Sequence, residues 1–177
     1  ILPYSYQIIG SGPPGLTLDS SGTVLGTPTA SGTFVLEIMV SDSTGGTPGS
    51  VSSYYTVNVL PPTLTLSPGS LSAATAGVAY SQTLQASGGI APYTYSVSGN
   101  LPRGITFDPD SGTLSGTPAA SGSFTLTISA RDSTAGTAGT VSQNYTFNVA
   151  VPTLTLTPGS LPAATAGMPY SQTIQAS

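Results

Sequence analysis

The sequence repeats itself with a period of 90 residues. From Ser20 onward, 45 of the 68 residue pairs that lie 90 positions apart are identical, which is 66%. Before Ser20 the separation is 89, so one residue has been gained near Pro109, in a turn where an insertion is tolerated. Self-similarity at a fixed period marks repeated structural units, and this period has the size of one small domain. The chain must therefore fold as a series of similar small domains.

Two proline-bearing stretches, 59–62 and 149–152, each follow a strand-like run and predict the joints between units. Residues 61–150 are then one complete repeat. Residues 1–60 correspond to the rear part of a repeat and lack its first two strands, whereas residues 151–177 correspond to the first two strands of a following repeat. We expect a sandwich made from 1–60 alone to expose apolar side chains and unpaired strand edges.

Within the complete repeat, short runs alternate apolar and polar residues with period two, as half-buried strands do. Turn-forming Gly, Pro, Asp and Ser residues separate these runs, and no stretch has a helical period. The pattern predicts seven strands: Thr63–Ser67, Tyr80–Ser87, Tyr93–Ser98, Ile105–Asp108, Thr113–Gly116, Ser123–Arg131 and Ser142–Val149. The residues predicted to face inward are Tyr93, Tyr95, Val97, Phe124, Leu126, Ile128, Ala130, Tyr145, Phe147 and Val149. The fold class that follows is all-β, with tandem immunoglobulin-like β-sandwich repeats of about 90 residues.

The composition excludes several classes of function. The chain has no Cys or His, and its only basic residues are Arg103 and Arg131. A zinc site would have no thiolate or imidazole, Ser-His or Cys-His catalysis would have no base, and a nucleic-acid surface would have almost no cations. No apolar run approaches the roughly 20 residues that a membrane helix needs. We therefore expect no catalytic centre, no nucleic-acid partner and no membrane insertion.

Several strings of the complete repeat resemble the Ig-like repeats of large bacterial surface proteins, a family close to the cadherin-like domains of dystroglycan type. These strings are Leu101-Pro-Arg-Gly-Ile-Thr-Phe-Asp108, Ser111-Gly-Thr-Leu-Ser-Gly-Thr-Pro118, Gly122-Ser-Phe-Thr-Leu126 and Ala130-Arg-Asp-Ser133. The resemblance spans essentially the whole chain. It implies an Ig-like fold, an extracellular location on a bacterial cell surface, and a role in stalks or adhesive arrays.

Calcium is the one cofactor that the resemblance brings into question, because cadherin-like joints hold Ca²⁺ with clustered carboxylates. The candidate ligands are Asp108, Asp110 and Asp132. Calcium takes six to eight oxygen ligands, and the whole chain has only six acidic residues. The alternative is that Asp108 is a turn former whose side chain bonds to nearby backbone N–H groups. We favour that alternative and expect no cofactor.

The offset between the chain and its repeats suggests a mode of self-association. The C-terminal 27 residues carry the two strands that 1–60 lacks, with apolar positions at Leu154, Leu156, Tyr170 and Ile174. A next molecule could receive these strands, which would give a head-to-tail fibre. The alternative is that the 177 residues are a window on a longer continuous array. The near identity of the units favours this alternative, because tandem duplication makes long arrays. Both interpretations place the domains in a line.

Three hypotheses for function follow. The first is a non-enzymatic structural repeat of an extracellular bacterial stalk, fibre or adhesin. The second is a carbohydrate- or surface-binding adhesin module, which requires an exposed aromatic patch; Tyr54 is the one candidate, because it breaks the alternation. The third is an accessory domain of a secreted hydrolase.

Overall fold

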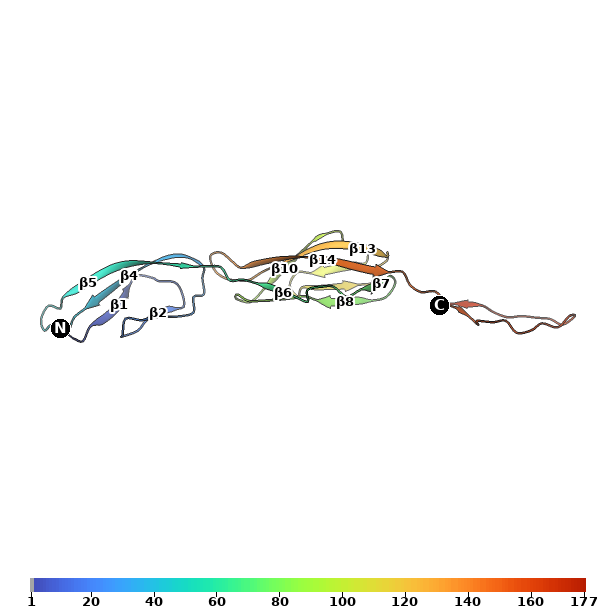
Figure 1. Ribbon diagram of the computed structural model, residues 1–177, viewed down its shortest axis with the longest axis horizontal. Helices are drawn as coiled ribbons and strands as arrows, with labels where there is room; N and C mark the ends of the chain where they lie inside the picture. Colours follow the sequence, from blue (N-terminus) through green and yellow to red (C-terminus); the bar gives the residue numbers. More distant parts are fainter. Residues whose placement is uncertain (1) are drawn as a thin grey trace.

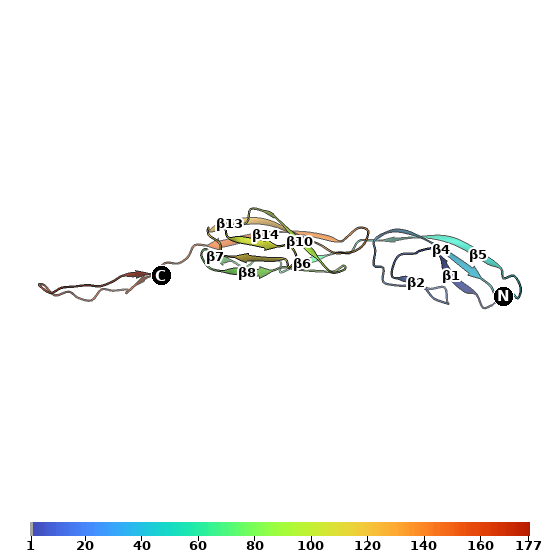
Figure 2. The same ribbon diagram turned by 180° about the vertical axis from the view of Figure 1, so that it is seen from behind.

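The computed structural model describes residues 2–177, which form only strands, turns and loops. Three parts follow one another along one long axis (Figure 1): an N-terminal unit (residues 2–60), a central unit (residues 61–150) and a C-terminal segment (residues 151–177). The view from behind shows the same order, with the C-terminal segment and the N-terminal unit at opposite ends (Figure 2). A search of the described range finds no helix that could cross a membrane. The predicted all-β class is confirmed.

The central unit is a sandwich of two packed layers. One sheet has the order β10-β13-β14-β7, and across the core lie a second sheet, β11-β12-β8, and the strand pair β6-β9. The strands are β6 (Thr65–Ser67), β7 (Ala74–Thr75), β8 (Tyr80–Thr83), β9 (Gln85–Ser87), β10 (Thr94–Gly99), β11 (Ile105–Asp108), β12 (Thr113–Gly116), β13 (Gly122–Arg131) and β14 (Thr140–Ala150). Every pair is antiparallel except β14-β7, which is parallel.

A single hydrophobic core joins the two layers of the central unit. The predicted inward positions on β13 and β14 are buried or half-buried, whereas the residues between them are mostly exposed. Tyr80 of one layer packs against Phe147 of the other with 4.8 Å between ring centroids. The fully enclosed members of the core include Leu84, Leu114, Leu126, Ile128 and Phe147. The alternating pattern therefore places the core side chains of β13 and β14 correctly. Tyr93, which was also predicted to face inward, precedes β10 and lies outside this core, where its hydroxyl donates to the Gly88 carbonyl over 2.6 Å.

One predicted strand is divided in the structure, and one observed strand was not predicted. The run Tyr80–Ser87 is divided at Leu84, because its first part pairs with β12 and its second part pairs with β6. The Leu84 N–H instead donates to the Gly112 carbonyl over 2.9 Å. The other difference is β7, which the sequence analysis did not predict, because two residues are too few to show alternation.

The N-terminal unit contains the counterparts of β10 to β14. Its strands are β1 (Ser5–Ile9), β2 (Leu16–Leu18), β3 (Val24–Gly26), β4 (Gly32–Ser41) and β5 (Ser50–Val59). They form a sheet β1-β4-β5 and a separate pair β2-β3. Among the described residues of this unit, β3 has no strand on its second edge, whereas the equivalent β12 pairs with β8 there. Among the described side chains of this unit, Leu36 and Pro13 are as enclosed as the core side chains of the central unit.

The C-terminal segment forms one small strand pair and an extended loop. Here β15 (Leu156–Thr157) pairs antiparallel with β16 (Gln175–Ala176), and every residue from 151 to 177 is exposed. This pair has the same register as β6 with β9, since Leu156 faces Ala176 as Leu66 faces Ala86. The segment therefore already has the local geometry of the start of a repeat.

Candidate functional site

The N-terminal and central units meet through Ser31 and the loop that follows β13. The Ser31 N–H donates to the Ala135 carbonyl over 2.9 Å. Its hydroxyl donates to the Thr137 carbonyl over 2.6 Å and accepts from the Thr137 N–H over 2.7 Å. Ala30 and Ala135 form a parallel β-bridge beside these bonds. Ser31 is buried, so the joint is a defined contact between the two units as well as a covalent link.

Asp132 holds the loop that Ser31 contacts. This buried carboxylate accepts hydrogen bonds from the Gly139 N–H over 2.7 Å, from the Ile90 N–H over 3.0 Å and from the Thr134 hydroxyl. Burial acts to raise the pKa of Asp132, but these hydrogen bonds outweigh it and leave the pKa below its ordinary value. Asp132 therefore positions the loop as a charged acceptor.

Gly136 allows the two units to approach closely. It has a φ of +80°, and a Cβ atom at this position would lie 2.2 Å from the Ser31 carbonyl oxygen. Gly46, its counterpart in the N-terminal unit, has a φ of +96° and no atom within 4 Å of such a Cβ. Both positions favour glycine for backbone reasons, but only Gly136 also needs the absent side chain for a contact between units.

An apolar groove of about 470 Å³ lies on the inner face of the N-terminal sheet. Its lining includes Tyr6, Val24, Leu36, Tyr55 and Val57. We call it the open groove. In the central unit the counterparts of these five residues belong to the hydrophobic core or pack against it.

Equivalent side chains of the two units differ in how much of their surface is exposed. Tyr55 is 53% exposed, whereas its counterpart Tyr145 is 2% exposed. Val24 is 40% exposed, whereas its counterpart Leu114 is fully enclosed. In the central unit, β8 pairs with the strand that carries Leu114, and Leu84 between β8 and β9 is part of the same core. The open groove therefore has the surface properties of a core with one part uncovered.

The predicted self-association residues lie far from the open groove within one chain. Leu154, Leu156, Tyr170 and Ile174 are all on the C-terminal segment, and their exposed fractions run from 46% to 78%. Only Leu156 lies in a strand. The run around Tyr170 was predicted to be a strand, but it has no strand structure before β16. Figure 1 shows this segment at the end of the molecule opposite the N-terminal unit.

The three calcium candidates do not come together. Asp108 accepts from the Asp110 N–H over 3.0 Å and from the Ser111 hydroxyl over 2.7 Å, as a turn former does. The bonds from Ser111 and Asp110 lower the pKa of Asp108. Asp132 is engaged in the loop described above. Within residues 2–177 there is no group of three or more acidic side chains that could hold a metal ion.

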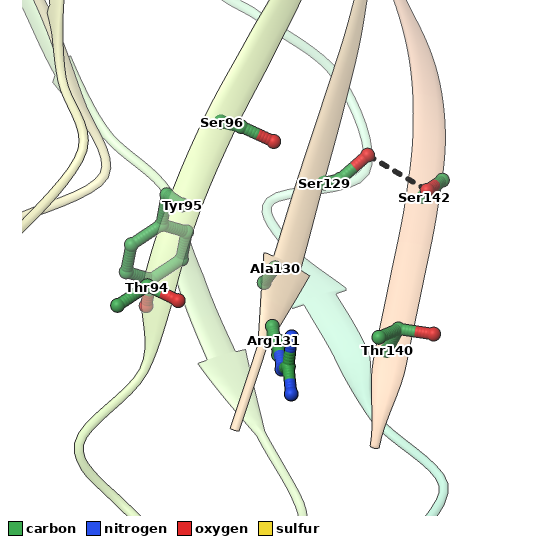
Figure 3. A pocket seen from close by; sticks show the side chains of 8 residues that line it. All are labelled: Thr94, Tyr95, Ser96, Ser129, Ala130, Arg131, Thr140 and Ser142. Atoms are coloured by element: carbon green, nitrogen blue, oxygen red, sulfur yellow. Dashed lines mark hydrogen bonds between the residues drawn. The ribbon is translucent and has the colours of Figure 1, made fainter. Parts of the chain in front are cut away.

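The outer face of the central sheet carries a hollow of about 340 Å³ that is lined mainly by hydroxyl-bearing residues (Figure 3). Its hydroxyl-bearing residues come from all three long strands, and Ser129 and Ser142 share a hydrogen bond of 2.7 Å. Arg131 is the one charged residue that lines it. With no carboxylate or imidazole in its lining, this hollow has no acid–base pair for catalysis.

The outer face of the N-terminal sheet differs from that of the central sheet because it carries an exposed aromatic side chain. Tyr54 is 72% exposed, as the sequence analysis predicted for a candidate binding residue, and it lies directly opposite Glu37 in the β4-β5 ladder. The central unit has Asn144 opposite Thr127 at the same place. An exposed aromatic ring beside a carboxylate is therefore specific to the N-terminal unit.

The alternating strands and the two-layer core define a tandem Ig-like β-sandwich protein. The chain belongs to the family described as "Putative Ig domain", whose model matches residues 1–60 and 61–150. No curated protein matches the sequence.

Several solved structures are similar to this chain at low sequence identity. Mouse cadherin-23 EC22-24 is 19% identical, with a TM-score of 0.44, over 84% of this chain and 53% of that one. A SusE-like, surface-located polysaccharide-binding protein of Bacteroides thetaiotaomicron is 16% identical, with a TM-score of 0.39, over 82% of this chain and 29% of that one. An endo-fucoidan hydrolase of glycoside hydrolase family 107 is 21% identical, with a TM-score of 0.38, over 85% of this chain and 24% of that one. The chain thus spans about half, or less, of the length of each.

Proposed function

We propose that this chain is a non-enzymatic structural part of an extracellular bacterial stalk, fibre or adhesin, built from Ig-like units joined end to end. The observation that carries the proposal is the Ser31 joint. Four hydrogen-bonding groups of two successive units meet there: the Ser31 N–H, the Ser31 hydroxyl, the Ala135 carbonyl and the Thr137 peptide. A joint of this kind fixes the direction of one unit relative to the next, which a load-bearing or spacing element requires.

The surface chemistry supports the same function. Charged residues make up only 5% of the chain, and no cysteine is present to be oxidised. The exposed strand faces of the central unit carry Ser and Thr, which pair across strands, as in Thr83 with Thr113 over 2.8 Å. Prolines in the connections 59–62 and 149–152 limit bending. Such a surface suits a passive spacer outside the cell.

The joint can be tested by separating contact from covalent linkage. We expect Ser31→Ala and Gly136→Ala to loosen the joint, because the first removes the bridging hydroxyl and the second places a methyl group against the Ser31 carbonyl. The matched controls are Ser121→Ala and Gly46→Ala, at the equivalent positions of the other unit. Both control residues lie away from the joint, Ser121 being exposed and Gly46 having open space around it.

The measurements are small-angle X-ray scattering, for the longest dimension, and NMR relaxation, for the tumbling of each unit in dilute solution. Wild-type and control chains should behave as one rod. The two joint variants should show units that reorient independently. Independent tumbling of the wild-type units, or joint variants that remain as stiff as the controls, would contradict the proposal.

The proposal includes head-to-tail association of chains by strand complementation. Two exposed apolar surfaces support it: the open groove of the N-terminal unit and the C-terminal segment. Water-exposed apolar area of this extent favours association.

A second candidate function is carbohydrate binding by the N-terminal unit. The exposed ring of Tyr54 offers a stacking surface, and Glu37 across the ladder offers an acceptor for sugar hydroxyls. Affinity electrophoresis in gels that contain polysaccharides tests it. Tyr54→Ala should abolish any retardation, whereas Tyr4→Ala, an exposed tyrosine outside that ladder, should preserve it.

A role as an accessory domain of a secreted hydrolase predicts a catalytic domain in the same gene.

A further inference from the structure

We propose that two copies of this chain pair side by side, through the outer face of the N-terminal sheet in one copy and the hollow on the outer face of the central sheet in the other. We call the first surface the Tyr54 face, which is the outward side of β1, β4 and β5. We call the second the Arg131 hollow, which has a volume of about 340 Å³. The contact is lateral, so it goes beyond the proposed end-to-end arrangement and involves neither the open groove nor the C-terminal segment.

On their longest shared strands, the two units have similar inner faces and different outer faces. Three of the four inward side chains of β4, Phe34, Leu36 and Ile38, are identical to their counterparts on β13. All five outward positions of β4, by contrast, differ from those of β13. These strands therefore give the two units different surface chemistry over a similar core.

The Tyr54 face is an apolar and aromatic patch around one carboxylate. The strand register places Ile9 opposite Glu37, and Glu37 opposite Tyr54, in one row across the sheet. Val35 and Met39 flank Glu37 on the same side of β4, and the exposed fractions of Ile9, Val35 and Tyr54 are 38%, 56% and 72%. The counterparts of these four apolar or aromatic residues in the central unit are all polar: Ser98, Thr125, Ser129 and Asn144. Apolar side chains gathered on an exposed sheet face are typical of a surface that binds a partner.

The Arg131 hollow has the complementary chemistry. The strand register places Arg131 between Thr94 and Thr140, and Figure 3 shows its side chain between theirs. The next row of the sheet consists of Ser96, Ser129 and Ser142. No acidic residue lines the hollow. A guanidinium beside several hydroxyl groups is a favourable partner for a carboxylate that approaches from another molecule.

Glu37 and Arg131 match the two surfaces to each other. Glu37 is the one charged residue in the strands of the N-terminal sheet, and Arg131 is the one charged residue in the strands of the central sheet. Neither side chain forms an ion pair within residues 2–177. When Glu37 of one copy lies against Arg131 of the other, the neighbouring ring of Tyr54 comes within reach of the guanidinium and of the hydroxyl groups around it. Because each copy carries both halves of the contact, a second copy is the partner that this charge complementarity selects.

The arrangement of the two units allows antiparallel copies to make this contact twice. Both views place the β1-β4-β5 sheet and strands β13 and β14 on the same, upper side of the long axis (Figure 1 and Figure 2). The hydrogen bonds of Ser31 hold the two units in this relation. When two copies turn these sides toward each other and run in opposite directions, the Tyr54 face of each meets the Arg131 hollow of the other. Such a contact has twofold symmetry and closes at a dimer.

Charge reversal tests the pairing. In a dimer of Glu37→Arg chains both contacts bring Arg against Arg, and in a dimer of Arg131→Glu chains both bring Glu against Glu. We expect each variant alone to raise the dissociation constant of the dimer at least about tenfold, measured by sedimentation velocity over a concentration series at low ionic strength. An equimolar mixture of the two variants should recover the association of the wild type, because both contacts of the mixed dimer again place Arg against Glu.

Matched controls carry the same changes of charge away from both surfaces. Asp110→Arg and Arg103→Glu lie at exposed positions in the turns that flank β11, in the other layer of the central unit. Both controls should associate as the wild type does. Neither Glu37 nor Arg131 belongs to a hydrophobic core, so thermal unfolding of every variant should match that of the wild type and exclude misfolding as a cause.

Three results would overturn the inference. One is a wild-type chain that remains at 17.5 kDa throughout the concentration series. Another is association of the single charge reversals that equals that of the controls, and the third is a mixture of the two variants that fails to recover. Should the reversals have no effect while Tyr54→Ala abolishes retardation by a polysaccharide, the Tyr54 face binds carbohydrate instead.

The lateral contact and the proposed end-to-end function can fail separately. Strand complementation through the open groove involves neither Glu37 nor Arg131, so it would affect all the variants equally. It also predicts oligomers that grow with concentration, whereas the lateral contact closes at a dimer. Differences between the reversals and their controls therefore report the lateral contact alone.

Discussion

Two leucines at equivalent positions of the repeat lie in a closed core and in an open one. Their truncation to alanine should therefore change the free energy of unfolding by different amounts. Leu126 and Leu36 occupy equivalent positions on β13 and β4, with exposed fractions of 0% and 1%. Leu126 is enclosed by both layers of the central unit, so Leu126→Ala leaves a closed cavity. Leu36 lines the open groove, so Leu36→Ala widens a space that water already enters.

These two situations differ in the cavity contribution to stability. Leu126→Ala should reduce the free energy of unfolding of the central unit by about 3–4 kcal/mol, the transfer cost together with the cavity cost. Leu36→Ala should cost the N-terminal unit about 2 kcal/mol, chiefly the transfer of the lost side-chain atoms. For a domain of this size, a loss of about 3 kcal/mol lowers Tm by roughly 12–24 °C.

The assay is thermal unfolding of dilute, monomeric chains, with hydrogen exchange and mass spectrometry to assign each transition to residues 2–60 or 61–150. In the wild type, peptides of the central unit should exchange more slowly, because its core is closed. Leu126→Ala should move only the central transition. If Leu36→Ala proved as costly as Leu126→Ala, or if both units of the wild type were equally protected, the interpretation of the open groove would be wrong.

Three further changes probe other contacts. Asp132→Ala should destabilise the central unit by about 2–4 kcal/mol in chemical denaturation, because the Gly139 and Ile90 N–H groups lose a charged acceptor. The pKa of Asp132 is lowered in the folded state, so its contribution to stability is complete above the ordinary value of 3.8 and is lost as the pH falls through the lowered pKa. Melting curves from pH 7 to 2 should show this loss of stability. In Asp132→Asn the loss should be smaller. Tyr145→Phe should cost the central unit about 1 kcal/mol by removing the bond to the Pro68 carbonyl, whereas Tyr55→Phe should leave the stability of the dilute monomer unchanged, as paired denaturant titrations can establish.

Much of the fold could be predicted because the alternation is long where the strands are long. The strands β13 and β14 have ten and eleven residues, enough for the alternation to indicate which face is buried, and the structure confirms those faces. The strands Ile105–Asp108 and Thr113–Gly116 coincide with their predicted bounds because turn residues flank both. The strand β7 could not be predicted, because it is defined only by its parallel pairing with the end of β14.

The candidate sites were less accessible from sequence, because they depend on register and on contacts between units. Ser31 lies in an Ala-Ser-Gly string that indicates only a turn, and nothing local identifies the Thr137 peptide, 106 positions away, as its partner. The exposure of Tyr54 was predictable from broken alternation, but its position opposite Glu37 required the β4-β5 register. The acidic residues were predictable as turn formers, since local hydrogen bonds explain Asp108 without a metal.

The Ser31 joint has a genetic consequence. Ser121 repeats Ser31 on the central unit, and the loop at 45–47 repeats the loop at 135–137 on the N-terminal unit, so each unit carries both halves of the same contact. A duplicated repeat therefore brings a working connection with it and needs no compensating mutation. Recombination between such similar stretches of DNA can lengthen or shorten the array in whole-unit steps, and the reach of the protein becomes a quantity that selection can adjust without redesigning a single interface.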